Sequence, residues 1–219
     1  MINRFYKLCL FKSRGRMIIK TSSKYNLASK FYDLMETGIE RRLFSKLREK
    51  VIPLASGDVL EIGVGTGKNL QYYKTPVKVS AIDFSRGMLK KAEDKLKRLE
   101  RQDIELILMD AQNLDFENNR FDSITAAFVF CTVPDPVKGF NEAYRVLKPG
   151  GKAYFTEHML TDNSFINSIL FIMNIFSKIF LGTSMIRKTE NNIKEAGFKI
   201  ISSERYLNGI VRVIVAEKI

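Results

Sequence analysis

The stretch VLEIGVGTGKNL, residues 59–70, decides how this chain folds. An apolar run ends there in three glycines at alternate positions: Gly63, Gly65 and Gly67. This pattern is typical of a buried strand that runs into a tight turn. Because glycine has no Cβ, the backbone of such a turn can approach a ligand closely.

Strand-like and helix-like segments alternate on both sides of this stretch. Strands are expected at residues 78–85, 104–110, 121–130, 152–158, 199–207 and 209–219. Helices are expected at residues 26–50, 87–100 and 190–198, near Lys68, and from Pro136 to the Pro149–Gly150 stop. Strands that are apolar on both faces and separated by helices indicate a parallel sheet covered on both sides. The predicted class is therefore a doubly wound α/β fold, whose ligands bind at the carboxyl ends of the strands.

The composition fits one compact domain with an unusually positive charge. Of the 219 residues 45% are hydrophobic, and 36 Lys and Arg against 24 Asp and Glu give a net charge of +12. Such a surface attracts nucleic acid or an anionic membrane. Cys9 and Cys131 form no close pair and His158 is the single histidine, so neither a disulfide framework nor a metal site is expected. The cysteine usage fits a reducing compartment, and we expect a cytoplasmic protein that is peripheral to the membrane.

The first 25 residues are expected to form a basic tail or arm ahead of the domain at residues 26–219. Eight Lys or Arg residues precede the first acidic residue, Asp33. The stretch has no long apolar core, so a secretory signal is not expected. A tail, an arm on a membrane surface, an over-long start before Met17, and an organellar transit peptide remain as interpretations.

The spacing of the glycines decides which of the known glycine-rich ligand-binding turns this segment matches. The dinucleotide pattern GxGxxG needs a glycine at position 68, which is Lys68. The phosphate loop needs Ser or Thr after the lysine, where the chain has Asn69. The pattern that fits has Glu61 two residues before the first glycine. It resembles motif I of the class I methyltransferases that bind S-adenosylmethionine.

Later segments resemble the same family in the same order. Asp83 ends the second strand 22 residues after Glu61, and a carboxylate there can accept both ribose hydroxyls. MDAQNLDF, FDSITAAFVF and RVLKPGG follow as further family segments. The resemblance implies a Rossmann-like, mostly parallel seven-stranded sheet with its last strand antiparallel. It also implies a cofactor site for S-adenosylmethionine made by Glu61, Gly63, Gly65, Gly67, Asp83, Phe84, Asp110, Ala111, Ala127 and Phe128.

Within the class, the chain is similar to the methyltransferase type 11 group. That group includes ubiquinone and menaquinone C-methyltransferases, bacterial phosphatidylethanolamine N-methyltransferases and membrane-associated thiol methyltransferases. GVGTGKNLQYY and VPDP are most similar to the phospholipid enzymes, whereas FCTV and YFTEH are similar to the thiol enzymes. The motifs therefore specify the cofactor better than the acceptor.

An apolar insert at about residues 160–188 is the segment expected to meet the acceptor. In FINSILFIMNIFSKIFL (residues 165–181), twelve of 17 residues are strongly apolar. A spanning helix needs about 20 such residues, so the insert is either a core-packed cover or an interfacial helix. Lys178, Arg187, Lys188 and the basic N-terminus favour an anionic surface, where each cation contributes about 1 kcal/mol.

Two residues are candidates for roles in the transfer itself. His158 lies at the carboxyl end of its strand, and the ordinary pKa of histidine, about 6.5, suits a general base; it could equally position the acceptor. Tyr32 is expected in a lid over the cofactor. Cys131 is expected to serve packing.

The function expected first is methylation of a lipid-like or small hydrophobic acceptor, with phosphatidylethanolamine N-methylation at a membrane surface as the leading form. A quinone-ring C-methyltransferase and a small-thiol S-methyltransferase are the alternatives. An RNA methyltransferase is disfavoured, because AAFV stands where a [DN]PP[YF] signature would be, and nucleic acid is not an expected partner. A SAM-binding regulator without turnover is the alternative from another class, and the oligomeric state is left open.

Overall fold

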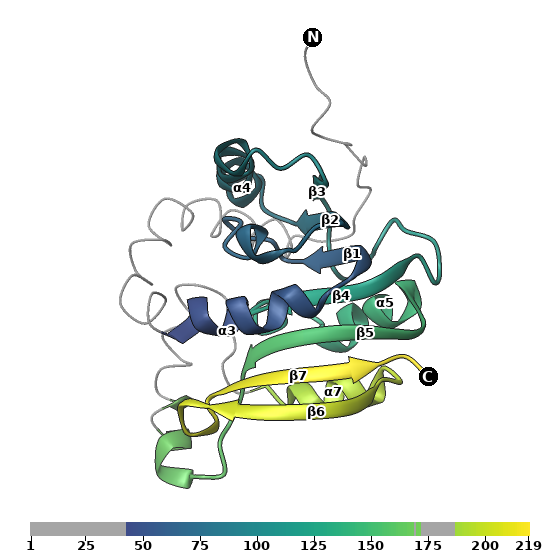
Figure 1. Ribbon diagram of the computed structural model, residues 1–219. Coiled ribbons are helices and arrows are strands. Elements are labelled where there is room, and N and C mark those ends of the chain that lie inside the picture. Colours follow the sequence, from purple (N-terminus) through teal and green to yellow (C-terminus); the bar gives the residue numbers. More distant parts are fainter. Residues whose placement is uncertain (1–42, 169, 172–186) are drawn as a thin grey trace.

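The computed structural model describes residues 43–168, 170–171 and 187–219 (Figure 1). The expected basic tail, the lid residue Tyr32 and the central part of the apolar insert lie outside these residues. The described part is built on one sheet with the strand order β3-β2-β1-β4-β5-β7-β6.

Five strands of this sheet are parallel: β1 (Gly57–Ile62), β2 (Val77–Asp83), β3 (Ile104–Leu108), β4 (Phe121–Ala127) and β5 (Leu147–His158). β7 (Val211–Glu217) runs antiparallel to both β5 and β6 (Lys199–Tyr206). The predicted seven-stranded, mostly parallel sheet with an antiparallel last strand is confirmed. The chain goes outward from β1 to β3 and returns to β4 on the other side of β1, so the strand order reverses between β1 and β4. Ligands bind at such a reversal in open α/β sheets.

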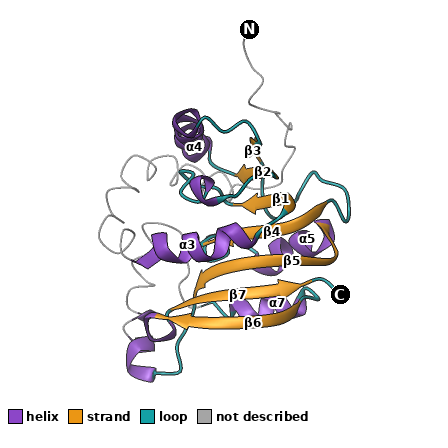
Figure 2. Ribbon diagram, viewed as in Figure 1, coloured by secondary structure: helices purple, strands orange, loops and turns teal. Residues whose placement is uncertain are grey.

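Helices cover both faces of the sheet (Figure 2). α3 (Ser45–Val51) and α4 (Arg86–Leu99) pack on one face, and α5 (Pro136–Val146) and α7 (Thr189–Glu195) pack on the other. Short 3-10 helices occur at η2 (Ile52–Leu54), η3 (Leu70–Tyr72) and η4 (Leu207–Gly209). Residues 164–168 and 170–171 are also helical.

The core follows from side-chain alternation in the strands. On β5, Phe155 points to the α5 side, where its ring lies 5.2 Å from that of Phe140, whereas Tyr154 belongs to the cluster under α3 and α4. Successive strand residues point to opposite faces, so a strand buried on both sides must be apolar at nearly every position. The near-continuous apolar runs of the sequence therefore have their explanation in two helical layers.

The helix boundaries follow from local capping. α4 begins after Ser85, whose Oγ accepts the Met88 N–H at 3.3 Å, and α5 begins after Asp135, whose Oδ1 accepts the Lys138 N–H at 3.1 Å. A short polar side chain at this position satisfies an N–H group that the first turn of a helix leaves free. Pro136 occupies the first turn of α5, where its missing N–H costs nothing.

The predicted helix near Lys68 is wrong. The Gly67 N–H bonds to the Val64 oxygen at 2.9 Å and the Leu70 N–H bonds to the Gly67 oxygen at 3.3 Å, so the segment consists of tight turns that lead into η3. These bonds span three residues, whereas an α-helix spans four. The glycine turn thus opens into a 3-10 turn without the dipole of a long helix.

The predicted end of α5 is also too late. The helix ends at Val146, and Leu147 already has the extended ψ of 139° as the first residue of β5. Pro149 disfavours helical geometry at the residue before it, Lys148. β4 in turn ends at Ala127, three residues earlier than predicted, because Phe128 has a positive φ of 60°.

Candidate cofactor and acceptor site

The glycine turn follows β1 at the point where the strand order reverses. All three glycines have a positive φ, of 71°, 55° and 80° for Gly63, Gly65 and Gly67. A Cβ at Gly63 would lie 2.5 Å from Cγ2 of Val129, and a Cβ at Gly67 would lie 2.7 Å from Cδ1 of Leu70. A Cβ at Gly65 would meet nothing within 4 Å. Gly63 and Gly67 therefore allow the turn to pack against the protein, and the open space for a ligand lies at Gly65.

Asp83 joins the end of β2 to this turn. Its Oδ2 accepts the Gly65 N–H at 2.9 Å, and its Oδ1 accepts the Ser85 N–H at 2.8 Å. Burial raises the pKa of this carboxyl to about 6, although the backbone N–H donors act in the opposite direction. The carboxylate is thus held rigidly beside the open space at Gly65.

Glu61 is the second buried carboxylate of the site. Its Oε1 accepts from Nδ2 of Asn69 at 2.8 Å, and no hydrogen-bond partner for its Oε2 is found in the described part of the chain. Burial raises the pKa of Glu61 to about 7, although the hydrogen bond from Asn69 and the positive charge of Arg48 act in the opposite direction. A buried carboxylate oxygen without a donor is rare in proteins, and a cationic ligand group would satisfy it. The ammonium group of S-adenosylmethionine fits that need.

Asp110 and Ala111 follow β3 on the same edge of the sheet. Oδ1 of Asp110 accepts from the backbone N–H of Gln112 at 2.9 Å and from its Nε2 at 3.1 Å. Oε1 of Gln112 in turn accepts the N–H of Asp135 ahead of α5, at 3.0 Å. The Asp110 carboxylate therefore stabilises the turn that follows β3. Its contact with adenine stays a prediction.

Three aromatic rings gather where β4 and β5 end. The ring of Phe128 lies 4.6 Å from that of Phe44 and 4.6 Å from that of His158, and the Phe44 and His158 rings are 6.2 Å apart. The guanidinium of Arg48 lies 5.9 Å from the centre of the Phe128 ring. All three rings are partly exposed. We call Phe44, Phe128 and His158 the aromatic trio.

The structure brings together most of the predicted residues at one edge. Glu61, Asp83 and Asp110 lie at or just beyond the ends of β1, β2 and β3, and His158 meets Phe128 next to them. Arg48, Asn69 and Phe44 were not predicted. Phe44 and Arg48 are four residues apart and share one side of the chain around α3. That spacing was the one signal that could have paired them.

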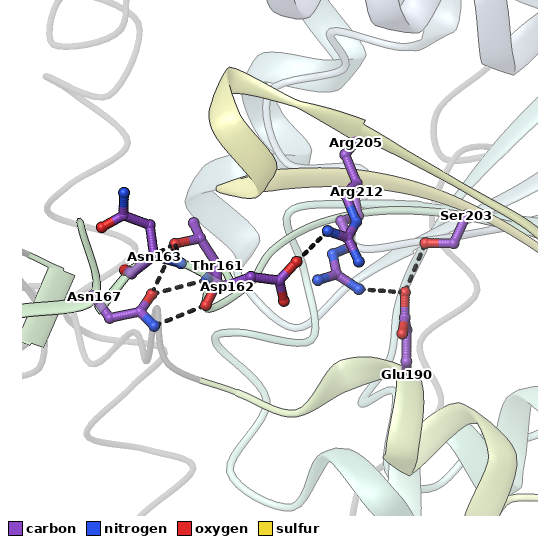
Figure 3. A network of polar contacts seen from close by, with 8 residues as sticks. All are labelled: Thr161, Asp162, Asn163, Asn167, Glu190, Ser203, Arg205 and Arg212. Carbon is purple, nitrogen blue, oxygen red and sulfur yellow. Dashed lines mark hydrogen bonds and ion pairs between the residues drawn. The ribbon is translucent and has the colours of Figure 1, made fainter. Parts of the chain in front are cut away.

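The flanks of the apolar insert are tied to β6 and β7 by a polar network, shown in Figure 3. On the first flank Asn167 exchanges hydrogen bonds with Thr161, and Asp162 forms an ion pair with Arg205. On the second flank Oε1 of Glu190 accepts from Arg212 at 2.7 Å and from Ser203 at 2.6 Å (Figure 3).

Two aromatic side chains at the first flank are exposed to solvent. Phe165 is 74% exposed and Phe171 is 47% exposed. Large exposed aromatic side chains are typical of surfaces that meet an apolar partner. Within the described ranges, no helix has the length and apolar character needed to cross a membrane.

The glycine turn and its two buried carboxylates lie at the reversal point of a doubly wound, Rossmann-like sheet, where folds of this class bind nucleotides. Residues 60–155 match the family model described as a methyltransferase domain. The match confirms the resemblance to methyltransferases that the sequence predicts, over the part of the chain that runs from β1 to β5.

Curated relatives share this domain. The chain is 40% identical over 107 residues to a phosphatidylethanolamine N-methyltransferase of Cereibacter sphaeroides, covering 48% of this chain and 53% of that protein. It is 34% identical over 142 residues to a demethylmenaquinone methyltransferase of Renibacterium salmoninarum, covering 64% and 56%. The chain spans a little over half the length of these relatives.

Solved structures share the fold. A SAM-dependent methyltransferase from Aquifex aeolicus superposes with a TM-score of 0.66 at 20% identity, covering 87% of this chain and 98% of that one. A protein from Thermotoga maritima described as a possible histamine N-methyltransferase superposes with a TM-score of 0.65 at 21% identity, covering 90% and 100%. These similarities confirm the fold.

Proposed function

We propose that this protein transfers a methyl group from S-adenosylmethionine to the amine headgroup of a phospholipid, with phosphatidylethanolamine as the first candidate, at an anionic membrane surface. The observation that carries the proposal is the aromatic trio, where the ends of β4 and β5 meet beside the cofactor site. Aromatic faces attract ammonium groups, and the attraction is strongest in effect where the cation is partly desolvated. An amine that becomes a methylated ammonium suits such a site.

Three further observations support a lipid acceptor. The match to the phosphatidylethanolamine N-methyltransferase is 40% identical over 107 residues. The net charge of +12 favours an anionic surface. Phe165 and Phe171 are large exposed side chains on the segment that follows β5, where acyl chains could be accommodated.

The chain's own groups have distinct tasks in binding. Glu61 would hold the ammonium of the cofactor, Asp83 the ribose hydroxyls, and the turn at Asp110 and Ala111 the adenine. Gly65 leaves room for the methionyl part. When bound, S-adenosylmethionine supplies an electrophilic methyl group on a sulfonium, so the protein mainly has to align the acceptor and exclude water.

His158 would remove the proton from the acceptor. An ammonium headgroup must lose a proton before its nitrogen can form the new N–C bond while the S–C bond breaks. The imidazole of His158, with its ring 4.6 Å from that of Phe128, would accept this proton and pass it to solvent. Phe128 and Phe44 would hold the headgroup against the face from which the methyl group arrives.

Labelled methyl transfer tests the proposal. Methyl-labelled S-adenosylmethionine would be supplied with vesicles that contain phosphatidylethanolamine and an anionic lipid, with Asp83→Ala as the inactive control. We expect label in methylated phosphatidylethanolamine for the wild type and none for the control. If the wild type binds the cofactor but labels no lipid, the acceptor proposal is wrong, and soluble thiols, amines and RNA are then assayed in the same way.

A quinone-ring C-methyltransferase is the second candidate. The relatives of this kind match over more of the chain, 142 residues at 34% identity. The exposed Phe165 would suit an isoprenoid tail as well as an acyl chain. Vesicles that contain both a demethylmenaquinone and phosphatidylethanolamine distinguish the two, because label would enter one lipid class and not the other.

A further inference from the structure

One fully buried carboxylate at this end of the sheet has no part in the chemistry above. Glu157 is the penultimate residue of β5, and its Oε1 accepts the Val129 N–H at 3.0 Å and the Phe130 N–H at 2.9 Å. Its Oε2 is also buried and has no hydrogen-bond partner in the described part of the chain. Burying a carboxylate in this way lowers the stability of the fold unless its contacts compensate, so these contacts must serve the fold or the function.

The two N–H groups belong to the turn that follows β4. Phe128 begins this turn with a φ of 60°, in the left-handed region that costs a residue with a Cβ about 1–2 kcal/mol. The Phe128 N–H donates to the Thr156 oxygen at 2.7 Å, and Sγ of Cys131 donates to the Phe128 oxygen at 3.5 Å. The turn therefore keeps its strained geometry through bonds to β5 and within itself.

Glu157 and His158 reach the same turn from opposite faces of the sheet. His158 meets the Phe128 ring on the α3 side. Glu157 is the register partner of Arg212 across β5 and β7, so both side chains point to the α7 side. There Arg212 pairs with Glu190 (Figure 3), and the charge of Arg187 acts on Glu157. Burial raises the pKa of Glu157 to about 7, whereas the backbone N–H donors and the positive charge of Arg187 lower it and so favour the ionised carboxylate.

We infer that Glu157 is a positioning residue: its carboxylate holds the turn after β4 so that Phe128 stands against His158 at the transfer site. The inference rests on the proposed methyl transfer. Two consecutive residues of β5 thus fix the position of Phe128. His158 contacts its ring, and Glu157 bonds to the backbone of the turn that carries it. When Glu157 is ionised, its bonds to the two N–H groups are charge-assisted and about twice as strong as the neutral bonds of an amide oxygen.

Two variants and a matched control test the inference. Glu157→Gln keeps an oxygen that can accept both N–H groups, whereas Glu157→Leu removes the acceptor at a similar size. Asp122→Asn is the control, since Asp122 holds the Asp58 N–H at 2.9 Å at the opposite end of β4. Amide hydrogen exchange in the cofactor-saturated protein should be faster at Val129 and Phe130 by at least about tenfold in Glu157→Leu, less in Glu157→Gln, and unchanged there in Asp122→Asn.

Kinetics provide a second, independent measurement. We expect kcat to fall by about ten- to a hundredfold in Glu157→Leu, with the cofactor Kd and the acceptor KM changed by less than about threefold. Glu157→Gln should recover part of that loss, and Asp122→Asn should keep the wild-type kcat. A residue needed only for stability would instead lower the active fraction and leave kcat per folded molecule unchanged, and that result overturns the inference.

Each failure has its own signature. If Glu157→Leu does not fold, Glu157→Gln decides alone, and wild-type exchange at both amides together with wild-type kcat overturns the inference. The exchange measurement needs no acceptor. Accelerated exchange in a protein that methylates no lipid would therefore keep the anchoring role and reject the proposed acceptor.

Discussion

The backbone N–H of Gly65 donates to Oδ2 of Asp83 at 2.9 Å, so the glycine turn after β1 is tied directly to the end of β2. Gly65 is also the glycine of this turn with open space around its missing Cβ. One carboxylate therefore both shapes the turn and stands where the ribose of the cofactor is expected. This double role makes the site sensitive to small changes at either residue.

Replacing Asp83 should remove cofactor binding. Asp83→Ala removes the hydrogen-bond acceptor for the Gly65 N–H and for the ribose hydroxyls. We expect this variant to bind S-adenosylmethionine at least about a hundredfold more weakly, and Asp83→Asn to bind it about tenfold more weakly. Calorimetric titration measures both. Asp94→Asn, on the exposed side of α4, is the matched control. Wild-type affinity in Asp83→Ala would reject the ribose role.

Cofactor affinity should depend on pH, because Glu61 and Asp83 have pKa values raised by burial to about 7 and about 6. In the proposed site their ionised forms hold the ammonium and the ribose. Cofactor affinity should therefore rise by at least about tenfold from pH 5.5 to pH 7.5, with proton release on binding. Stability without cofactor should change in the opposite direction. The folded state binds these protons more tightly than the unfolded state. The two protonated carboxyls therefore make their full contribution to the free energy of unfolding below about pH 4, and this contribution is lost as the pH rises to about 7. Titration calorimetry and thermal unfolding across this range measure both trends, and a flat affinity profile would contradict the first.

Arg48 should determine the pH at which cofactor affinity rises. Its positive charge lowers the pKa of the buried Glu61. Arg48→Met should therefore raise the pKa of Glu61 further and move the rise in cofactor affinity to higher pH, with weaker binding at pH 7. The same titrations measure the shift. An unmoved midpoint would show that the charge of Arg48 is not felt at Glu61.

The glycines should respond differently to alanine. Gly63→Ala places a Cβ 2.5 Å from Val129, so we expect a loss of about 2–4 kcal/mol in the free energy of unfolding. Gly65→Ala meets no neighbour and should cost only about 1 kcal/mol for its positive φ, yet weaken cofactor binding, because the added methyl group occupies the open space. Denaturant unfolding and calorimetry separate the two effects. Equal losses of stability would contradict the distinction.

His158→Gln should separate catalysis from binding. If the imidazole accepts the acceptor's proton, kcat should fall by about a hundredfold or more at pH 7 while cofactor affinity is kept. A variant that keeps the wild-type kcat would show that His158 does not act as the base.

Much of the fold could be predicted from the sequence, because strands buried on both faces leave apolar runs that are visible locally. The carboxylates near the ends of β1 and β2 could also be located, since Glu61 lies two residues before the first glycine and Asp83 ends the next apolar strand. The helix near Lys68 was wrong because turn bonds such as Gly67 to Val64 compete with helical ones, and local pattern does not show which set wins.

The sequence by itself determined the strands, the glycine turn and the resemblance to methyltransferases, because these depend on neighbours within a few residues. The tertiary structure alone decided which side chains meet at the site. Glu157 reaches the N–H of Val129 across 28 positions of the chain, and Phe44 reaches the ring of His158 from a different element. Such contacts arise from the packing of α3, β4 and β5 against one another. No local pattern records them, because their energy comes from burial and geometry that exist only once the layers have assembled.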